Sequence, residues 1–244
     1  MKIYVFDLVG KMAHFRKMDT NSSSLSYSFP PRTAVAGLIA GILGMERDSY
    51  YEQFSPENCD IAVSVKKPFR KVMQTVNYMF VKSGADLNNS SGHTPIPLEL
   101  ILPGAKEPHL RYRIYFSHQD ESINEMVKKR VQQRRYIFPP YLGLTECLGM
   151  LEWVGEAEAS VEISEDPVQI HSVARMSRLQ ERTVAIKENA RFIREHTTRF
   201  FLKGRMIGET DDYIFEQNHQ LFAVPKGPFL RIRHVENQEN ILFL

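Results

Sequence analysis

The sequence predicts an α+β protein with the element order strand, helix, strand, strand, helix, strand. Residues 2–9 are rich in β-branched and aromatic side chains, as strands are. Residues 32–45 and 121–135 instead space their apolar side chains as amphipathic helices do. Further strand-like stretches lie at 60–67, 110–116 and 147–163. This order is typical of ferredoxin-like domains, which include RNA-recognition modules.

The composition is that of a globular protein with no marked preference for a charged partner. The 244 residues are 43% hydrophobic and 25% charged, and the net charge is +2, so any basic surface must be local. Cys59 and Cys147 fit neither a zinc spacing nor a disulfide framework, which favours a reducing cytosol. We find no nucleotide motif and no His/Cys cluster, and we expect no cofactor and no metal.

The first predicted helix follows two prolines and carries three glycines on one face. Residues 33–45 form an uncharged run of thirteen residues, whereas a membrane-spanning helix needs about 20. We therefore expect no membrane segment. Gly37, Gly41 and Gly44 allow either close packing on a sheet or close approach by another backbone.

The second predicted helix, 121–135, should bury one apolar stripe. The side chains expected inside are Ile123, Met126, Val127 and Val131. The basic residues of "KKRVQQRR" are then most simply a solvated face.

An insertion and a change in composition along the chain indicate the expected domain organisation. Residues 68–109 separate the two middle strands, and their polar tip, 83–95, is typical of a functional or disordered loop. After about residue 163 the chain becomes more basic, with short strands near 213–224 and 229–235. We predict a ferredoxin-like domain at 1–154 and a smaller, mostly β domain at 155–244.

Three segments are candidates for binding phosphate or nucleic acid. The first is the start of helix 32–45, where free N–H groups and the dipole attract phosphate. Ser26 and Tyr27 precede it, Arg32 stands at its mouth and Arg16 lies on the same connection. The alternative is an ordinary capped core helix.

The second candidate is "KKPFRK" at 66–71 with "NYMFVK" at 77–82, where cations alternate with aromatic rings. Such a pattern suits a single strand of nucleic acid, because cations meet phosphates while rings stack on bases. The alternative is a solvated hairpin whose rings fold inward. The third candidate, "FPPYLGLTECLG" at 138–149, is a glycine-rich turn whose amides suit phosphate, or simply a tight helix-to-strand connection.

Together these segments resemble the CRISPR-associated protein 5 family of the RAMP superfamily, and the chain is closest in character to its type I-B branch. The resemblance rests on "YSFPPRTAVAGLIAGILG", "PPYLGLTECLG" and the chain length, with looser matches at "FIREHTTRFFLKGRM" and "DDYIFEQN". It implies a ferredoxin-like domain with a long β-hairpin thumb and a smaller C-terminal β-domain.

The resemblance also implies a role. Members are subunits of Cascade, the prokaryotic RNA-guided surveillance complex; they grip the 5′ handle of the crRNA and cap the filament of backbone subunits. The expected partners are crRNA, the backbone subunit and the large subunit in the cytoplasm, while contact with target DNA near the protospacer-adjacent motif stays open. The residues that this implies for RNA binding are Arg16, Ser26, Tyr27, Arg32, Lys67, Arg70, Lys71, Asn77, Tyr78, Lys82, His93, Tyr141, Leu142 and Gly143.

One branch of the family cuts precursor crRNA without metal, by means of a tyrosine with a neighbouring lysine and histidine. This chain has no adjacent Lys–His pair, and only Tyr27, Lys82 and His93 remain as candidates. We therefore expect a non-catalytic RNA-binding subunit. The alternatives are a metal-independent endoribonuclease and an unrelated cytosolic α/β protein.

Overall fold

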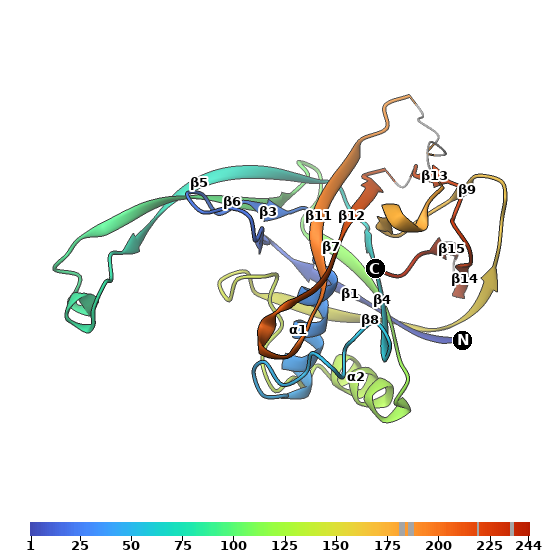
Figure 1. Cartoon of the computed structure of the whole chain (residues 1–244), viewed down its shortest axis with the longest axis horizontal. Coiled ribbons are helices and arrows are strands. Elements are labelled where there is room, and N and C mark those ends of the chain that lie inside the picture. Colours follow the sequence, from blue (N-terminus) through green and yellow to red (C-terminus); the bar gives the residue numbers. More distant parts are fainter. Residues whose placement is uncertain (181–183, 185–187, 219, 235–236) are drawn as a thin grey trace.

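The protein is built around one curled antiparallel sheet of six strands (Figure 1). The computed structural model describes residues 1–180, 184, 188–218, 220–234 and 237–244. The strand order is β15-β14-β8-β1-β7-β4. The bounds are Lys2–Gly10 (β1), Cys59–Val65 (β4), Leu110–His118 (β7), Gly149–Glu162 (β8), Phe229–His234 (β14) and Asn237–Ile241 (β15). The predicted α+β class is confirmed in its coarser form, a mostly β chain with two α-helices.

Both helices pack on the same face of this sheet (Figure 1). They are α1 (Arg32–Leu43) and α2 (Glu121–Gln133). Because strand side chains alternate, Tyr4 and Phe6 of β1 join the core under the helices, while Ile3 and Val5 join a second cluster on the other face.

Helix α2 buries three of the four side chains expected inside. Ile123, Val127 and Val131 are at most 1% exposed, but Met126 is 46% exposed. The prediction for Met126 is wrong because this position lies beside the stripe that faces the sheet. The helix begins at Asp120, whose carboxylate accepts a 2.9 Å hydrogen bond from the amide of Ser122.

The end of α1 is closely approached by the segment that follows α2. Helix α1 ends at Gly44, which has a φ of +80°, and a Cβ there would lie 2.9 Å from Ile137. Ile137 and Phe138 donate their amides to the carbonyls of Ile42 and Gly41, at 3.2 Å each. The segment after α2 thereby supplies a donor to the Ile42 carbonyl at the end of α1 and a second donor to that of Gly41, which also accepts from Gly44.

The predicted insertion is a long β-hairpin that projects from the body (Figure 1). Its strands are β5 (Phe69–Met79) and β6 (His93–Pro103), and the short helix η1 (Gly84–Asn88) lies at its tip. Two bridges attach its base to the N-terminal connection, Ala13 with Ile101 and Ser24 with Leu98.

The C-terminal part contributes strands to several sheets. The three-stranded sheet has the order β10-β12-β11, and β11 packs on α1. The remaining elements are β2 (Phe15–Arg16), β3 (Ser26–Tyr27), β9 (Val168–Gln169), β10 (Ala174–Arg175), η2 (Met176–Arg178), β11 (Phe192–Phe201), η3 (Lys203–Arg205), β12 (Ile207–Glu216) and β13 (Phe222–Ala223). Strand β8 runs through residues 154 and 155, and β14 and β15 complete the central sheet, so a division at this point would cut one continuous strand. The division into two domains stays a prediction.

No α-helix within the described ranges is long and apolar enough to cross a membrane.

Candidate nucleic-acid interface

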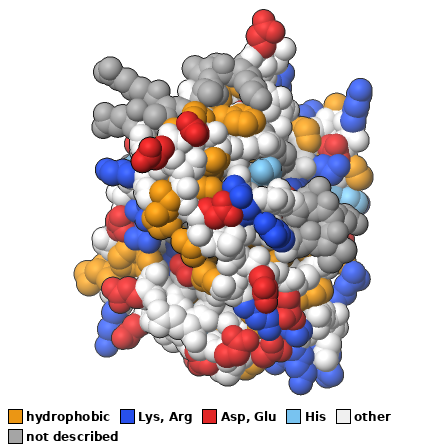
Figure 2. Space-filling model, turned by 90° about the vertical axis from the view of Figure 1, so that its right-hand side faces the viewer, with side chains coloured by type: hydrophobic (Ala, Val, Ile, Leu, Met, Phe, Trp, Pro, Cys, Tyr) orange, Lys and Arg blue, Asp and Glu red, His pale blue; other side chains and the backbone are white. Residues whose placement is uncertain are grey.

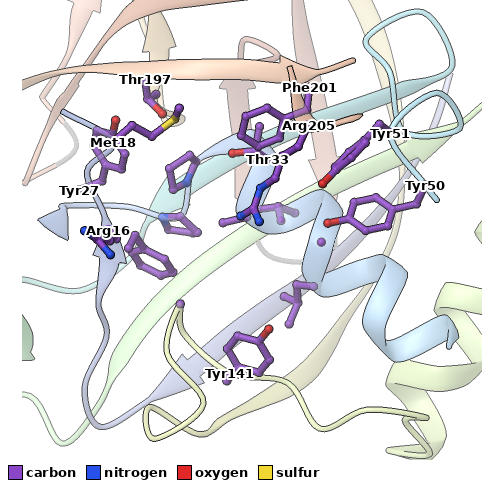
Figure 3. A pocket seen from close by; sticks show the side chains of 18 of the residues that line it. Arg16, Met18, Tyr27, Thr33, Tyr50, Tyr51, Tyr141, Thr197, Phe201 and Arg205 are labelled. Atoms are coloured by element: carbon purple, nitrogen blue, oxygen red, sulfur yellow. The ribbon is translucent and has the colours of Figure 1, made fainter. Parts of the chain in front are cut away.

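A cavity of about 570 Å³ lies at the start of α1 (Figure 3). Around the start of α1, four parts of the chain enclose it: the N-terminal connection around β2 and β3, the segment after α1 (residues 47–51), the loop after α2, and the turn between β11 and β12. Its aromatic lining residues are Phe15, Tyr27, Tyr50, Tyr51, Tyr141 and Phe201, and its arginines are Arg16, Arg47 and Arg205. The volume is within the range of sites that hold a small molecule or one unit of a polymer.

The arginines of this cavity are weakly engaged. Arg16 is exposed, and no carboxylate of the described residues lies within ion-pair distance of it. Arg47 is 84% exposed and, within the part of the chain that the structure describes, pairs only with its neighbour Asp48, at 3.4 Å, a type of surface pair that contributes little. The guanidinium of Arg205 lies 6.0 Å from the ring centre of Phe201. These cations are therefore available to an anionic ligand.

The tyrosines on the opposite wall are neutral hydrogen-bonding rings. Burial raises the pKa of the Tyr50 hydroxyl, and burial followed by a hydrogen bond to Asp48 raises the pKa of Tyr51 to about 12. Figure 3 shows both rings facing the cavity from the segment after α1. Rings without charge suit stacking and hydrogen bonding rather than proton transfer at neutral pH.

Arg32 does not reach this cavity. Its side chain is buried, with 2% of the residue exposed, and it donates to the carbonyls of Phe54 at 2.9 Å and Cys59 at 2.6 Å. The prediction that Arg32 meets phosphate at the helix mouth is wrong, because one carbonyl of the loop before β4 and one at the start of β4 hold the guanidinium inside the protein. Arg32 instead braces the fold, as in the alternative of an ordinary core helix.

Ser26 and Lys71 are likewise committed to the protein. The amide of Ser26 donates to Glu99 at 2.8 Å, and its carbonyl accepts a 2.6 Å hydrogen bond from Lys71. Lys71 also lies 3.3 Å from Glu99 and 3.6 Å from Glu195. The buried Glu195 forms a further ion pair with Lys17. The prediction for Ser26 is wrong because the residue is fully buried, and Lys71 ties the hairpin to the body.

The glycine-rich turn is shaped by packing. Leu142 is fully buried, and its amide donates to the carbonyl of Cys147 at 2.8 Å, so the prediction that it contacts RNA is wrong. Gly143 has a φ of +91°, and a Cβ there would come within 1.9 Å of the carbonyl oxygen of His14. Glycine is thus required because the loop presses on the N-terminal connection. Tyr141 is 41% exposed and, with Gly143, lines the cavity.

Tyr27 lies in the wall of the cavity and is only 5% exposed. Burial raises the pKa of its hydroxyl, and the ammonium of Lys17 lies 5.5 Å from its ring centre. Its ring edge therefore borders the space, while most of its surface is covered by protein.

The remaining predicted residues lie along the hairpin. Arg70, Asn77 and Tyr78 are exposed on β5, and Lys67 precedes it in a 3.2 Å pair with Glu107. Tyr78 and Arg16 both line a smaller cavity of about 150 Å³ between the hairpin and the N-terminal connection. Since Arg16 also lines the main cavity, the two spaces are adjacent, and we refer to them together as the track.

The three nuclease candidates are not brought together. His93 pairs with Met79 at the far end of the hairpin, and Lys82 follows that end of β5. Tyr27 lies in the body, next to Ser26, whose carbonyl contacts Lys71 at the hairpin base. The eight residue steps along β6 from His93 to Ile101 separate the far end of the hairpin from its base by about 25 Å at the usual strand rise.

Of the aromatic and arginine residues that line the cavity, sequence reasoning missed six: Phe15, Arg47, Tyr50, Tyr51, Phe201 and Arg205. The signal that selected 66–82, cations alternating with rings, is also present in "RFFLKGR" at 199–205. Nothing in the sequence places this segment next to α1. Across the described ranges, no group of three or more His, Cys, Asp or Glu is arranged to hold a metal ion.

Comparison with known proteins gives a family for this chain. The sequence profile of the family described as CRISPR-associated protein (Cas_Cas5) matches residues 3–209. No curated protein matches.

Two solved structures are similar. The crystal structure of a CRISPR protein from Archaeoglobus fulgidus matches 98% of this chain and 99% of that chain, with a TM-score of 0.62 and 13% identity. A chain of a CRISPR RNA-guided surveillance complex matches over 91% of both chains, with a TM-score of 0.48 and 13% identity. The first of these shows a shared fold. Because the family profile covers most of the sequence, the chain belongs to the CRISPR-associated protein (Cas_Cas5) family.

Proposed function

We propose that this protein is a non-catalytic RNA-binding subunit of a type I Cascade complex that grips the 5′ handle of crRNA. The observation that carries the proposal is the track formed by the two cavities, which runs from Tyr78 on the hairpin past Arg16 to Tyr141. Weakly engaged arginines beside exposed rings are what single-stranded nucleic acid requires.

The fold supports the same proposal. Within the central sheet, the order β8-β1-β7-β4 with a helix after β1 and after β7 fits a ferredoxin-like RAMP domain. In this proposal the hairpin of β5 and β6 is the thumb, residues 155–244 form the smaller C-terminal domain, and the subtype is I-B. The partners are then the backbone subunit, the large subunit and crRNA, in the prokaryotic cytoplasm.

The proposal excludes RNA cleavage by this chain. What supports that part is the distance between Tyr27 in the body and the pair Lys82 and His93 at the far end of the hairpin. An acid–base mechanism needs its groups within hydrogen-bond reach of one another or of the substrate.

The test is to incubate the purified protein with repeat RNA in EDTA and to follow both binding and RNA length. We expect a retained RNA that is not shortened. Metal-independent cleavage that Tyr27→Phe or His93→Ala abolishes would replace the proposal with an endoribonuclease. If the protein bound no RNA, either alone or together with the other Cascade subunits, both the proposed binding subunit and the endoribonuclease would be refuted.

A further inference from the structure

The two strands of the hairpin are attached to the rest of the protein in different ways. Backbone hydrogen bonds of 2.8 to 3.0 Å, in the bridges at Ala13 and Ser24, join β6 to the N-terminal connection. In the described part of the chain, the backbone of β5 pairs only with β6. Strand β5 therefore reaches the body through side chains such as Lys71. A hairpin that is fixed along one strand can pivot about it unless the other strand is held as well.

Lys71 holds β5 to the body through contacts with two other segments. Its ammonium lies 3.6 Å from the carboxylate of Glu195 on β11 and donates to the carbonyl of Ser26 at 2.6 Å. It also lies 3.3 Å from Glu99, but that residue belongs to β6 and so to the hairpin itself. Of the two carboxylates around Lys71, Glu195 is thus the one that crosses to the body.

Glu195 is a buried carboxylate where β11, the hairpin and the N-terminal connection meet. The residue is 4% exposed, accepts a 2.8 Å hydrogen bond from the hydroxyl of Ser28 and forms ion pairs with Lys17 and Lys71. Figure 1 shows β11 passing beside the base of the hairpin. A carboxylate that has left water is stable only with such partners, so these contacts hold the three segments together.

We propose that Glu195 is a positioning residue that fixes the direction in which the hairpin leaves the body. We call Glu195, Lys17 and Lys71 the clamp. With the clamp closed, both strands of the hairpin are attached, β6 through its backbone and β5 through Lys71. The C-terminal sheet then sets the orientation of the hairpin through β11, although the two are far apart in the sequence.

The clamp also keeps two lysines beside the track away from RNA, a consequence that rests on the proposed function. The ammonium of Lys17 lies 5.5 Å from the ring centre of Tyr27, which lines the main cavity. Lys71 contacts Ser26, the neighbour of Tyr27. Because both ammonium groups already neutralise a buried carboxylate, a phosphate would have to compete with Glu195 for them.

The orientation of the hairpin can be measured in the whole protein as a distance distribution between two spin labels. Met79→Cys labels the far end of β5, and Lys129→Cys labels the exposed side of α2. Cys59 and Cys147 are 2% exposed and should not react with the label. We expect a narrow distribution when the clamp is intact.

Glu195→Gln opens the clamp, because it keeps the size of the side chain and an acceptor for Ser28 but removes the charge. We expect it to broaden the distance distribution. Lys71→Met should broaden it equally, and the double variant should broaden it no further, because both changes remove the same interaction. Glu107→Gln is the matched control, since it removes a 3.2 Å pair with Lys67 at the base of the hairpin and should leave the distribution narrow.

The positioning role is refuted if Glu195→Gln gives the wild-type width, or if the broadening in the two single variants adds up in the double variant. Should Glu195→Gln fail to fold, Lys71→Met decides alone. The side chain of Lys71 is 27% exposed, and its replacement leaves Glu195 paired with Lys17.

The salt dependence of binding to a short single-stranded repeat RNA tests the consequence for RNA. Glu195→Gln should steepen the slope of log affinity against log salt by about 0.7 for each lysine that it releases. The triple variant Glu195→Gln/Lys17→Met/Lys71→Met should lose this gain. Damage to the fold would not steepen the slope, so an unchanged slope would refute the protection of the lysines. If neither the wild type nor any variant binds RNA, the proposed function falls, while the distance distributions still decide whether Glu195 positions the hairpin.

Discussion

Two regions of the molecule carry arginines and lysines and use them in opposite ways. On the face of the sheet away from the helices, Arg111 and Arg113 contact Asp7 at 2.8 Å, and Arg111 also contacts Glu152 at 2.8 Å. On the same face Lys66 lies 2.7 Å from the buried Glu239. At the cavity, by contrast, the arginines have at most a weak surface partner among the described residues.

The difference shows that the availability of a cation, rather than the number of cations, marks a phosphate-binding surface. A cation held between two carboxylates gains nothing from a phosphate, because the exchange replaces one anion with another. Figure 2 shows basic and acidic side chains interspersed on the side of the molecule turned away from the hairpin. We expect RNA to avoid that side and to follow the track through Arg16.

The ion pairs on the face of the sheet away from the helices, which join Asp7, Lys66, Arg111, Arg113, Glu152 and Glu239, form the paired region. The largest expected effect on stability comes from removing a carboxylate of this region. Glu239→Gln leaves Lys66 without its buried carboxylate, while Arg113 keeps its pair with Asp7, and we expect a loss of roughly 3 kcal/mol in the free energy of unfolding. Glu158→Gln, an exposed position on β8, is the control and should change little. RNA affinity at neutral pH should be the same for both folded variants; a selective loss in Glu239→Gln would contradict the comparison.

The carboxylate of Glu239 also makes the stability of the protein depend on pH. Burial alone would raise the pKa of Glu239, but Lys66, Tyr115 and Arg113 outweigh burial and lower it from 4.5 to about 2. Because the folded-state pKa is the lower one, this group stabilises the protein above about pH 4.5, and the contribution is lost as the pH falls toward 2. Thermal unfolding across that range should show a smaller slope in Glu239→Gln than in the wild type.

A variant of Arg32 tests whether this cation stabilises the fold rather than binding RNA. Arg32→Ala removes the donors to the carbonyls of Phe54 and Cys59, and we expect a loss of about 2–3 kcal/mol in stability. Arg32→Met, which keeps the apolar stem, separates the loss of packing from that of hydrogen bonds. RNA affinity of the folded fraction should not change. Normal stability with weakened RNA binding would return Arg32 to the site.

A variant of Arg16 tests the cations of the track, and its expected effect is on RNA affinity rather than on stability. Arg16→Ala should weaken binding of a single-stranded RNA about tenfold, while the melting temperature stays within error because the side chain is exposed. Lys129→Ala, an exposed cation on α2, serves as the control. Equal affinities for the two variants would show that the track through Arg16 carries no RNA.

Replacement of the hairpin tip should change stability least of all these variants. Replacement of residues 83–93 by a short Gly-Ser linker removes η1, which has no buried residue, so the free energy of unfolding should change by about 0.5 kcal/mol or less. Assembly with crRNA and backbone subunits should be impaired. A normal complex would exclude the tip from the working thumb and leave the rest of the hairpin as a candidate.

The sequence predicted the elements of the central sheet well and the cavity poorly. The helices and the strands β1, β4 and β7 follow local periodicity, which a single sequence contains. The strand β11 was missed because its charged side chains interrupt the apolar pattern, and its partners come from distant parts of the chain. The roles of Arg32 and Leu142 depended on which side chains are buried, and that is decided by tertiary packing.

The most direct test of the account is the salt dependence of RNA binding in the wild type and in the double variant Arg16→Ala/Arg205→Ala. Each phosphate contact on a single strand contributes about 0.7 to the slope of log affinity against log salt. The account predicts a steep slope for the wild type and a slope smaller by about 1.4 for the double variant, with Lys66→Ala leaving the slope unchanged. A flat wild-type titration, or a slope that the double variant leaves unchanged, would contradict the claim that the available arginines of the cavity hold the RNA.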